Sequence, residues 1–181
     1  MTRSQELTPE ALAGLRERYR AERERRVRPD GVRQYLGADA RFGYYAADPY
    51  TTGPTEREPV RDRVDVAVVG GGFGGILAAA RLRGQGVARV RVVEKGGDFG
   101  GTWYWNRYPG ARCDIESTWY SYSFSPELER EWKWSQRYAK QEEILAYAGH
   151  VADRFALRPF MRFNTRVDGA HFDERAQEWV V

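Results

Sequence analysis

The chain has 181 residues, of which 41% are apolar, 14% aromatic and 30% charged, and its net charge is +3. This length and apolar content predict one compact domain, and the aromatic content argues against a disordered chain. So small a net charge gives only a weak argument for nucleic-acid binding, and we expect no nucleic-acid partner. The single cysteine, Cys113, excludes an internal disulfide, and His150 and His171 leave little for a histidine-based metal site.

No apolar stretch of the sequence is long enough to span a membrane. The longest uncharged run, residues 66–80, contains five glycines and ends at Arg81, whereas a membrane helix needs about 20 apolar residues. The first twenty residues lack the apolar core of a secretory signal. We therefore expect a soluble cytoplasmic protein without a membrane partner.

Residues 1–63 are polar and rich in arginine, and we expect them to form a helical and irregular N-terminal arm. A helix should start at residues 8–10, where threonine can cap, proline suits the first helical position and glutamate favours the positive helix end. It should end before the Pro-Asp-Gly turn at residues 29–31. Glycine and proline interrupt residues 37–63 without a clear period, so we expect this segment to wrap over the following domain.

A strand, a glycine loop, a helix and a second strand follow in order after residue 63. Residues 64–69 form a short β-branched run typical of a buried strand. A glycine loop at 70–75 leads into an alanine- and leucine-rich helix at 76–82, and residues 90–94 form a second apolar strand. This order predicts an α/β fold that starts a parallel sheet, with residues 64–181 as the domain.

Three further elements are predicted in the second half of the chain. Residues 141–155 carry apolar side chains at helical spacing, residues 160–167 alternate as a strand, and residues 170–181 resemble a hairpin. The chain ends at Val181 within that last predicted strand, which would leave its partner half unpaired. We therefore expect the sequence to be the first part of a longer protein.

Gly70, Gly72 and Gly75 match the pattern G-x-G-x-x-G at the end of the first predicted strand. In such a loop the first glycine makes the tight turn, the second lets the backbone approach a pyrophosphate, and the third lets the helix pack against the sheet. The N-terminus of the helix then offers free N–H groups and a positive dipole to the phosphates. These residues predict a dinucleotide site.

Glu94 ends the second predicted strand, 19 residues after Gly75. A carboxylate at this place accepts hydrogen bonds from ribose hydroxyls and would repel a 2′-phosphate, so the site favours FAD or NAD over NADP. Taken alone, the glycines also fit a flexible loop, and Glu94 also fits a solvated strand end. The order of strand, loop, helix, strand and acid favours the dinucleotide interpretation.

A second glycine-rich stretch, residues 95–101, follows the acid and could reach a longer, two-part ligand such as FAD. Aromatic residues are dense just after it. Either they wall a flat isoalloxazine ring or they belong to the core, and the residues alone leave both interpretations open. These aromatic residues are Trp103, Tyr104, Trp105, Tyr108, Trp119 and Tyr120.

The run at residues 100–117, GGTWYWNRYPGARCDIES, resembles the flavin domain of Baeyer–Villiger monooxygenases, which convert ketones to esters or lactones. The similarity covers about residues 64–181. It implies a Rossmann-like FAD-binding domain, present here in its first part. It also implies that NADPH reduces FAD, and that a flavin C4a-peroxide formed with O2 attacks the carbonyl of a ketone substrate.

The resemblance implies a role for each candidate site residue. Gly70, Gly72 and Gly75 would cradle the FAD pyrophosphate, and Glu94 would hold ribose. Asp114 would lie beside the flavin and orient a catalytic arginine that stabilises the anionic peroxide, although it also fits a helix cap before residues 115–117. The remaining contacts implied are Thr102, Trp103, Tyr104 and Trp105 along the flavin, Tyr120 against the cofactor, Val167 at the adenine end through its backbone, and Arg112, Cys113 and Asp114 next to the nicotinamide of NADP.

Parts of the family pattern are absent from this sequence. There is no second G-x-G-x-x-G for an NADP-binding domain, no linker signature with a central histidine, and no downstream catalytic arginine. We therefore expect the isolated chain to be inactive as an oxygenase.

Two alternatives stay open at this point. One is another FAD oxidoreductase with two dinucleotide sites, such as an N-hydroxylating monooxygenase or a disulfide reductase. Cys113 argues against the reductase because it has no second cysteine to form a redox pair, and we expect it to be a small buried hydrophobe. The other alternative is a module that binds a dinucleotide without catalysing a reaction.

Overall fold

A computed structural model of the chain describes residues 8–35, 40–51 and 56–181. By their contacts the residues divide into two units, Met1–Ala47 and Asp48–Val181. The sequence predicts that the domain starts at residue 64, whereas the contacts group Asp48 and the residues after it with the second unit. The predicted wrapping segment, residues 37–63, lies partly outside the described residues.

The described residues of the first unit form one α-helix and two short 3-10 helices. They are α1 (Pro9–Arg26), η1 (Gly31–Gln34) and η2 (Ala40–Ala46). As predicted, Thr8 caps α1, because its hydroxyl oxygen accepts a hydrogen bond of 3.2 Å from the Ala11 amide. The helix ends at Arg26, before the predicted turn.

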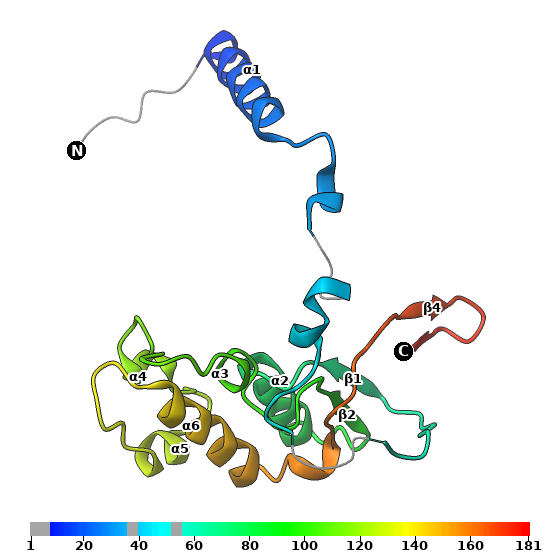
Figure 1. Ribbon diagram of the computed structural model, residues 1–181, viewed down its shortest axis with the longest axis vertical. Coiled ribbons are helices and arrows are strands. Elements are labelled where there is room, and N and C mark those ends of the chain that lie inside the picture. The colour runs from blue at the N-terminus through cyan, green and yellow to red at the C-terminus, as the bar shows by residue number, and fades with distance from the viewer. Residues whose placement is uncertain (1–7, 36–39, 52–55) are drawn as a thin grey trace. The chain divides into compact units, whose positions relative to one another are not determined.

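The second unit is built on a three-stranded parallel sheet (Figure 1). Its strands lie in the order β1-β2-β3, and Val92 of the central strand pairs with Val68 on one side and Met161 on the other. The helix α2 connects β1 to β2, as the predicted Rossmann-like start requires. The elements are β1 (Val66–Val69), α2 (Phe73–Gly84), β2 (Val90–Val93) and β3 (Met161–Arg162).

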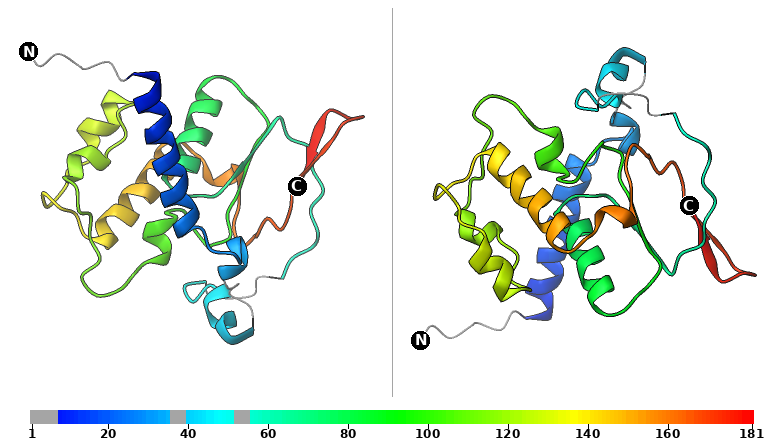
Figure 2. Two further views of the ribbon diagram at one scale, coloured as in Figure 1. Left: turned by 90° about the horizontal axis from the view of Figure 1, so that it is seen from above. Right: turned by 90° about the horizontal axis from the view of Figure 1, so that it is seen from below.

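Short helices and one long helix complete this unit. The long helix contacts α2, which in turn contacts β1 and β2, so α2 lies between the sheet and the long helix (Figure 1). The helices are α3 (Thr102–Trp105), α4 (Ser117–Tyr120), α5 (Pro126–Glu131), the long α6 (Gln141–Arg154) and η3 (Arg158–Phe160). The predicted hairpin is confirmed as the antiparallel pair β4 (His171–Asp173) and β5 (Glu178–Val180), which projects from the unit in Figure 2.

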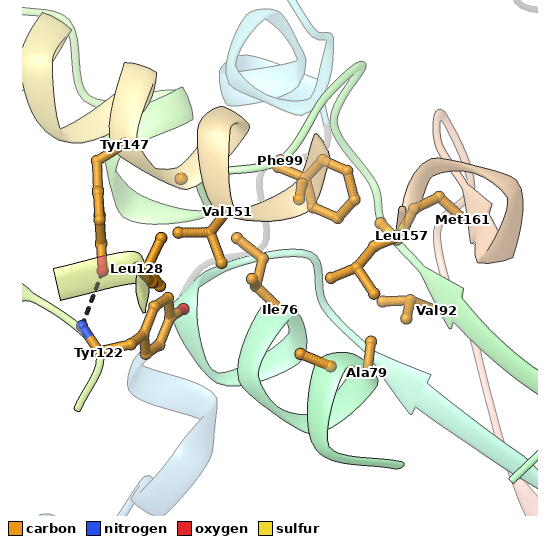
Figure 3. Close-up of a cluster of buried hydrophobic side chains, with 13 residues drawn as sticks. Ile76, Ala79, Val92, Phe99, Tyr122, Leu128, Tyr147, Val151, Leu157 and Met161 are labelled. Atoms are coloured by element: carbon orange, nitrogen blue, oxygen red, sulfur yellow. Dashed lines mark hydrogen bonds between the residues drawn. The ribbon is translucent and has the colours of Figure 1, made fainter. Parts of the chain in front are cut away.

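The core of the second unit joins α6 to α2 and to the sheet (Figure 3). Ile76, Val92 and Val151 are fully buried in it. Two tyrosines give this core its polar links: the Tyr122 amide donates to the Tyr147 hydroxyl at 2.8 Å, and the Tyr122 hydroxyl donates to the Phe73 carbonyl at 2.6 Å. Burial raises the pKa of both phenols, so both stay protonated. The core therefore holds the first residue of α2 in place.

Two predicted elements near the glycine loop differ from the structure. The first strand, predicted as buried, has Ala67 and Val69 exposed, the latter by 65%. Ala67 and Val69 lie on the face of β1 opposite to that of Val68, whose side chain packs against the core. Helix α2 starts at Phe73 rather than at residue 76, because Gly72 takes the N-cap position.

The predicted strand at residues 160–167 is much shorter in the structure. Only Met161 and Arg162 pair with β2. The backbone then leaves strand geometry at Asn164, whose φ is +52°. The amides of Asn164 and Thr165 still donate to the Gly96 and Glu94 carbonyls, at 3.0 and 2.9 Å, so this segment remains against the second glycine-rich stretch.

Within the described ranges, no helix is both long and apolar enough to cross a membrane. Those same ranges contain no group of three or more side chains that could hold a metal ion.

Replacing Tyr147 by phenylalanine removes the acceptor of the buried Tyr122 amide. We expect Tyr147→Phe to lower the free energy of unfolding by about 1–3 kcal/mol, the cost of an unsatisfied buried donor. Urea unfolding followed by tryptophan fluorescence measures this change. The control Tyr138→Phe alters a phenol that is 39% exposed and should shift the free energy by less than about 0.5 kcal/mol. Equal effects of the two substitutions would contradict the role of the Tyr147 hydroxyl.

Candidate dinucleotide-binding site

The first glycine loop turns the chain from β1 into α2. Gly70 has a φ of +101°, a conformation that favours glycine, and its amide donates to the Val93 carbonyl at 2.8 Å. Gly72 is the N-cap of α2, and no side chain caps this helix end. The amides of residues 73–75 therefore lack an intrahelical acceptor, and they mark the positive end of the helix. Such an end can bind a diphosphate.

The loop leaves no space for a side chain at Gly75 and little space at Gly72. A Cβ atom on Gly75 would lie 1.9 Å from the Gly70 carbonyl oxygen. A Cβ atom on Gly72 would lie 3.3 Å from the Cα atom of Gly101. The Gly100 amide also donates to the Gly71 carbonyl at 3.1 Å. The two glycine-rich stretches thus pack backbone against backbone, as close approach to a phosphate group requires.

Glu94 joins these two stretches. Its carboxylate accepts hydrogen bonds from the Gly71 amide at 2.5 Å and from the Gly96 amide at 2.6 Å. The residue is only 6% exposed. A carboxylate has about four acceptor positions, so two remain for the hydroxyls of a ribose. The structure therefore brings the predicted phosphate loop and the predicted ribose acid into direct contact.

The aromatic helix α3 after the second stretch is tied into the protein's own core. Tyr104 is buried, with 4% exposure. The Trp103 indole N–H donates to the Tyr120 hydroxyl at 2.9 Å, and the two rings form an edge-to-face pair. Trp105 is half-buried beneath the Lys95 ammonium group. Tyr104 therefore fits the core interpretation, while Trp103, Trp105 and Tyr120 keep part of their surface accessible.

Two more of the aromatic residues and one threonine lie at the surface. Tyr108 and Trp119 are 64% and 80% exposed. Thr102, the first residue of α3, is also exposed. Val167 is half-buried. It lies two residues after Thr165, whose amide donates to the Glu94 carbonyl.

Residues 111–114 run beside the start of α6. The Cys113 amide donates to the Ala139 carbonyl at 2.9 Å, and the Cys113 side chain is 3% exposed in a cluster with Ala139 and Ile144. The expectation of a small buried hydrophobe is confirmed. Arg112 and Asp114 flank it and are exposed. The cap interpretation of Asp114 is wrong, because Glu116 occupies the N-cap of α4.

One group of residues near the second glycine stretch has no motif in the sequence that identifies it. Asp48 accepts a hydrogen bond of 2.9 Å from the Gly97 amide, and Thr51 lies beside it. The Asp-Pro pair at residues 48 and 49 is a local turn signal. That signal does not reveal a partner located 49 positions away in the sequence.

A pocket of about 530 Å³ lies away from the glycine loop, between the end of α2 and η3. Its lining includes Phe124, Phe155 and Phe160 together with Arg81 and Arg83. It offers neither a helix N-terminus nor a carboxylate for ribose. The glycine loop is therefore the better dinucleotide site, since its backbone donors and acid match the chemistry of that ligand.

A family model described as an NAD(P)-binding Rossmann-like domain matches residues 68–133. The whole chain aligns with a Baeyer–Villiger monooxygenase from Streptomyces coelicolor at 63% identity, and the alignment covers 30% of that enzyme's length. The neopentalenolactone D synthase of Streptomyces avermitilis is 43% identical to the chain. That alignment covers 94% of the chain and 28% of the synthase. The chain thus spans about three tenths of these curated relatives.

Two of the solved structures that match the chain each cover 64% of it. One is a steroid monooxygenase bound to NADP, with 61% identity, a TM-score of 0.62 and 22% of its own length covered. The other is OTEMO in complex with FAD and NADP, with 43% identity, a TM-score of 0.61 and 22% of its length covered.

The contact between Gly75 and Gly70 predicts that alanine at position 75 and alanine at position 74 change the free energy of unfolding in opposite directions. We expect Gly75→Ala to lower the free energy of unfolding by roughly 1–3 kcal/mol, because its methyl group must displace the Gly70 backbone. Gly74→Ala should raise this free energy by about 0.5–1 kcal/mol, because position 74 is helical and has open space around it. Urea unfolding of both variants checks the prediction. A Gly75→Ala variant as stable as Gly74→Ala would show that the loop is not tightly packed.

Proposed function

We propose that this chain, a homologue of the N-terminal part of Baeyer–Villiger monooxygenases, supplies the first part of the FAD-binding domain in such an enzyme. In this proposal residues 64–181 belong to the FAD-binding domain. The enzyme oxidises a ketone to an ester or lactone with NADPH and O2. The observation that carries the proposal is the buried Glu94 carboxylate, which joins the two closely packed glycine stretches at the start of α2.

The residues present fit an FAD molecule. The missing side chains at Gly72 and Gly75 let the backbone approach a pyrophosphate, and the free amides at the start of α2 can donate to its oxygens. Glu94 has acceptor capacity left for the adenosine ribose. Its negative charge disfavours the 2′-phosphate of NADP at this same position, which leaves FAD or NAD. Of these two, FAD is the cofactor present in the OTEMO structure, and it is our proposed ligand of this loop. NADPH is then the ligand of a second site.

The remaining candidate residues have roles toward the two cofactors. Bound flavin supplies the redox chemistry with NADPH and O2, whereas the residues of this chain bind and orient it. In the proposal, Val167 meets the adenine end through its backbone. The residues along the flavin are Thr102, Trp103, Tyr104, Trp105 and Tyr120, and those next to the nicotinamide of NADP are Arg112, Cys113 and Asp114.

Burial decides how these residues can act. Cys113 and Tyr104 are buried, so they support their neighbours more than they contact a ligand. Asp114 is exposed, and it is the candidate catalytic residue. Its carboxylate would orient an arginine from another part of the enzyme, and this arginine would stabilise negative charge that develops during oxygen transfer.

The substrates are a small-molecule ketone and O2, and neither a nucleic acid nor a membrane takes part. The protein is proposed to be cytoplasmic, because a single buried thiol suits a reducing compartment. The isolated chain would not catalyse oxygenation, because it offers one dinucleotide loop where the reaction needs two.

A chimeric enzyme tests the proposed function. The chain replaces the matching part of the Streptomyces coelicolor relative, to which it is 63% identical. We expect the purified chimera to retain FAD and to consume NADPH when a cyclic ketone is added, with a lactone as the product. The isolated chain should form no lactone. A chimera that folds and holds FAD but forms no lactone would contradict the proposed activity.

In the same chimera, Glu94→Gln should weaken FAD binding by about 10- to 100-fold, because it removes the charge from hydrogen bonds worth roughly 1.5–3 kcal/mol. Flavin absorbance retained after dialysis measures this loss. The matched control is Glu142→Gln, which changes an exposed residue of α6 and should bind FAD like the parent chimera. If Glu94→Gln also binds FAD like the parent, Glu94 does not hold the ribose.

A further inference from the structure

Asp48 gathers hydrogen bonds from three separate parts of the second unit. Its Oδ2 atom accepts from the Gly97 amide at 2.9 Å and from the Tyr104 hydroxyl at 2.8 Å. The Thr51 hydroxyl lies 2.8 Å from the same oxygen. The Oδ1 atom accepts from the Tyr50 amide at 2.9 Å. One half-buried carboxylate therefore fixes the segment at residues 48–51 to the second glycine stretch and to α3.

Ring contacts hold the same segment from a second direction. The Tyr50 ring meets the Tyr104 ring edge-to-face, with centroids 5.7 Å apart. The Arg107 guanidinium lies 3.8 Å from the Tyr50 ring centroid and 4.9 Å from that of Tyr104. Arg107 also donates from Nε to the Tyr104 carbonyl at 2.8 Å. These cation–π and hydrogen-bond contacts fix the position of Tyr104 relative to residues 48–51.

The second glycine stretch is enclosed between this segment and Tyr104. A Cβ atom on Gly97 would lie 2.4 Å from the Thr51 hydroxyl oxygen and 2.8 Å from the Tyr104 hydroxyl oxygen. A Cβ atom on Gly96 would lie 2.9 Å from the Tyr104 ring. Because Gly96 and Gly97 carry no side chains, Asp48 can reach the backbone of this stretch. The close neighbours of both glycines leave that backbone little freedom to move.

The enclosed backbone leads directly to the ribose acid. Gly97, whose amide binds Asp48, follows Gly96, whose amide donates to the Glu94 carboxylate at 2.6 Å. A shift of Gly97 would therefore move the donor that orients Glu94. This connection runs from Asp48 through two glycines to Glu94.

Asp48 is suited to this role by its charge. Burial acts to raise the pKa of Asp48, but the hydrogen bonds from the Tyr50 amide, the Tyr104 and Thr51 hydroxyls and the Gly97 amide outweigh it and lower this pKa below its ordinary value. The carboxylate is ionised at neutral pH, so both of its oxygens are acceptors. An asparagine would place an NH2 group where one of these acceptors stands.

We propose that Asp48 is a positioning residue for the dinucleotide site, which acts by holding residues 95–97 and Tyr104 so that Glu94 meets the ribose. This inference rests on the proposed function, because it assumes that FAD is the ligand of the loop. Residues 48–51 thus belong to the cofactor site in function, although they lie far from its motif in the sequence. The influence of Asp48 on Glu94 passes from Gly97 to Gly96 through backbone atoms alone.

The test compares Asp48→Asn with Asp62→Asn in the full 181-residue chain. Asp62 is a matched control, because it lies in the same N-terminal part of this unit and pairs with Arg91, away from residues 95–97. FAD titration gives the dissociation constant, and hydrogen exchange of the ligand-free chain gives the protection of the Gly96 and Gly97 amides. We expect Asp48→Asn to bind FAD about tenfold more weakly and to exchange these two amides about tenfold faster, while Asp62→Asn changes neither.

Each outcome decides the proposal. If Asp48→Asn binds FAD like the parent chain, or if its exchange increases equally throughout the unit, Asp48 is merely a stabilising residue and the proposal is wrong. If the parent chain alone binds no FAD, the same two substitutions are compared in the chimera. If the chimera also binds no FAD, the proposed function fails, and the exchange of Gly96 and Gly97 alone decides whether Asp48 holds the loop. Should Asp48→Asn fail to fold, Tyr104→Phe removes the hydroxyl that donates to Asp48 and accepts from the Gly97 amide at 3.1 Å. This variant should speed Gly97 exchange and weaken FAD binding by a few-fold, and unchanged values of both would contradict the proposal.

Discussion

The Glu94 carboxylate, with its two backbone donors, is the interaction on which the rest of this site depends. A buried carboxylate without hydrogen bonds would be very unfavourable. The amides of Gly71 and Gly96 stabilise it, and because one belongs to each glycine stretch, the same carboxylate fixes the distance between them. The sheet supports this arrangement, since the Glu94 amide donates to the Arg162 carbonyl at 2.8 Å. The acid that would bind ribose is therefore also the link that shapes the phosphate loop.

Close packing of the glycines and the hydrophobic core also hold the site in its shape. The glycine stretches can meet because neither carries a Cβ atom at the contact of Gly72 with Gly101. The core holds the other end of the site, because the Tyr122 hydroxyl donates to the carbonyl of Phe73, the first residue of α2. Packing of α6 thus reaches the helix end that would bind the pyrophosphate. Rigid support of this kind lets backbone amides bind a phosphate without reorganisation.

Local patterns predicted the parts of the structure that depend on local geometry. The Thr8 cap, the order of strand, loop, helix and strand, and the C-terminal hairpin follow from residue types within a few positions of one another. The glycine spacing and Glu94 were also readable, because steric access and a strand end define them. The residue types of β1 could not predict that one of its faces is exposed, because the burial of a face depends on which other elements pack against it. Likewise, the bend at Asn164 shortened a segment whose alternation predicted a longer strand.

Contacts between residues far apart in the sequence could not be predicted. Nothing near Asp48 indicates that its partners are Gly97 and Tyr104, because a turn-forming aspartate is common at a Pro-containing turn. The aromatic residues after the second glycine stretch were ambiguous for a related reason. Tyr104 is buried by residues 48–51 and by the glycines, whereas Trp119 remains exposed, and composition alone does not separate these two cases.

The most direct test of the account is a map of the backbone amides that respond when FAD is added to the isotopically labelled chain. The account predicts that the largest NMR shift changes fall on residues 71–76 and on Gly96, where the helix end and the ribose acid meet. Shift changes that instead cluster around Arg83 and Phe160, at the pocket beyond the far end of α2, would contradict it.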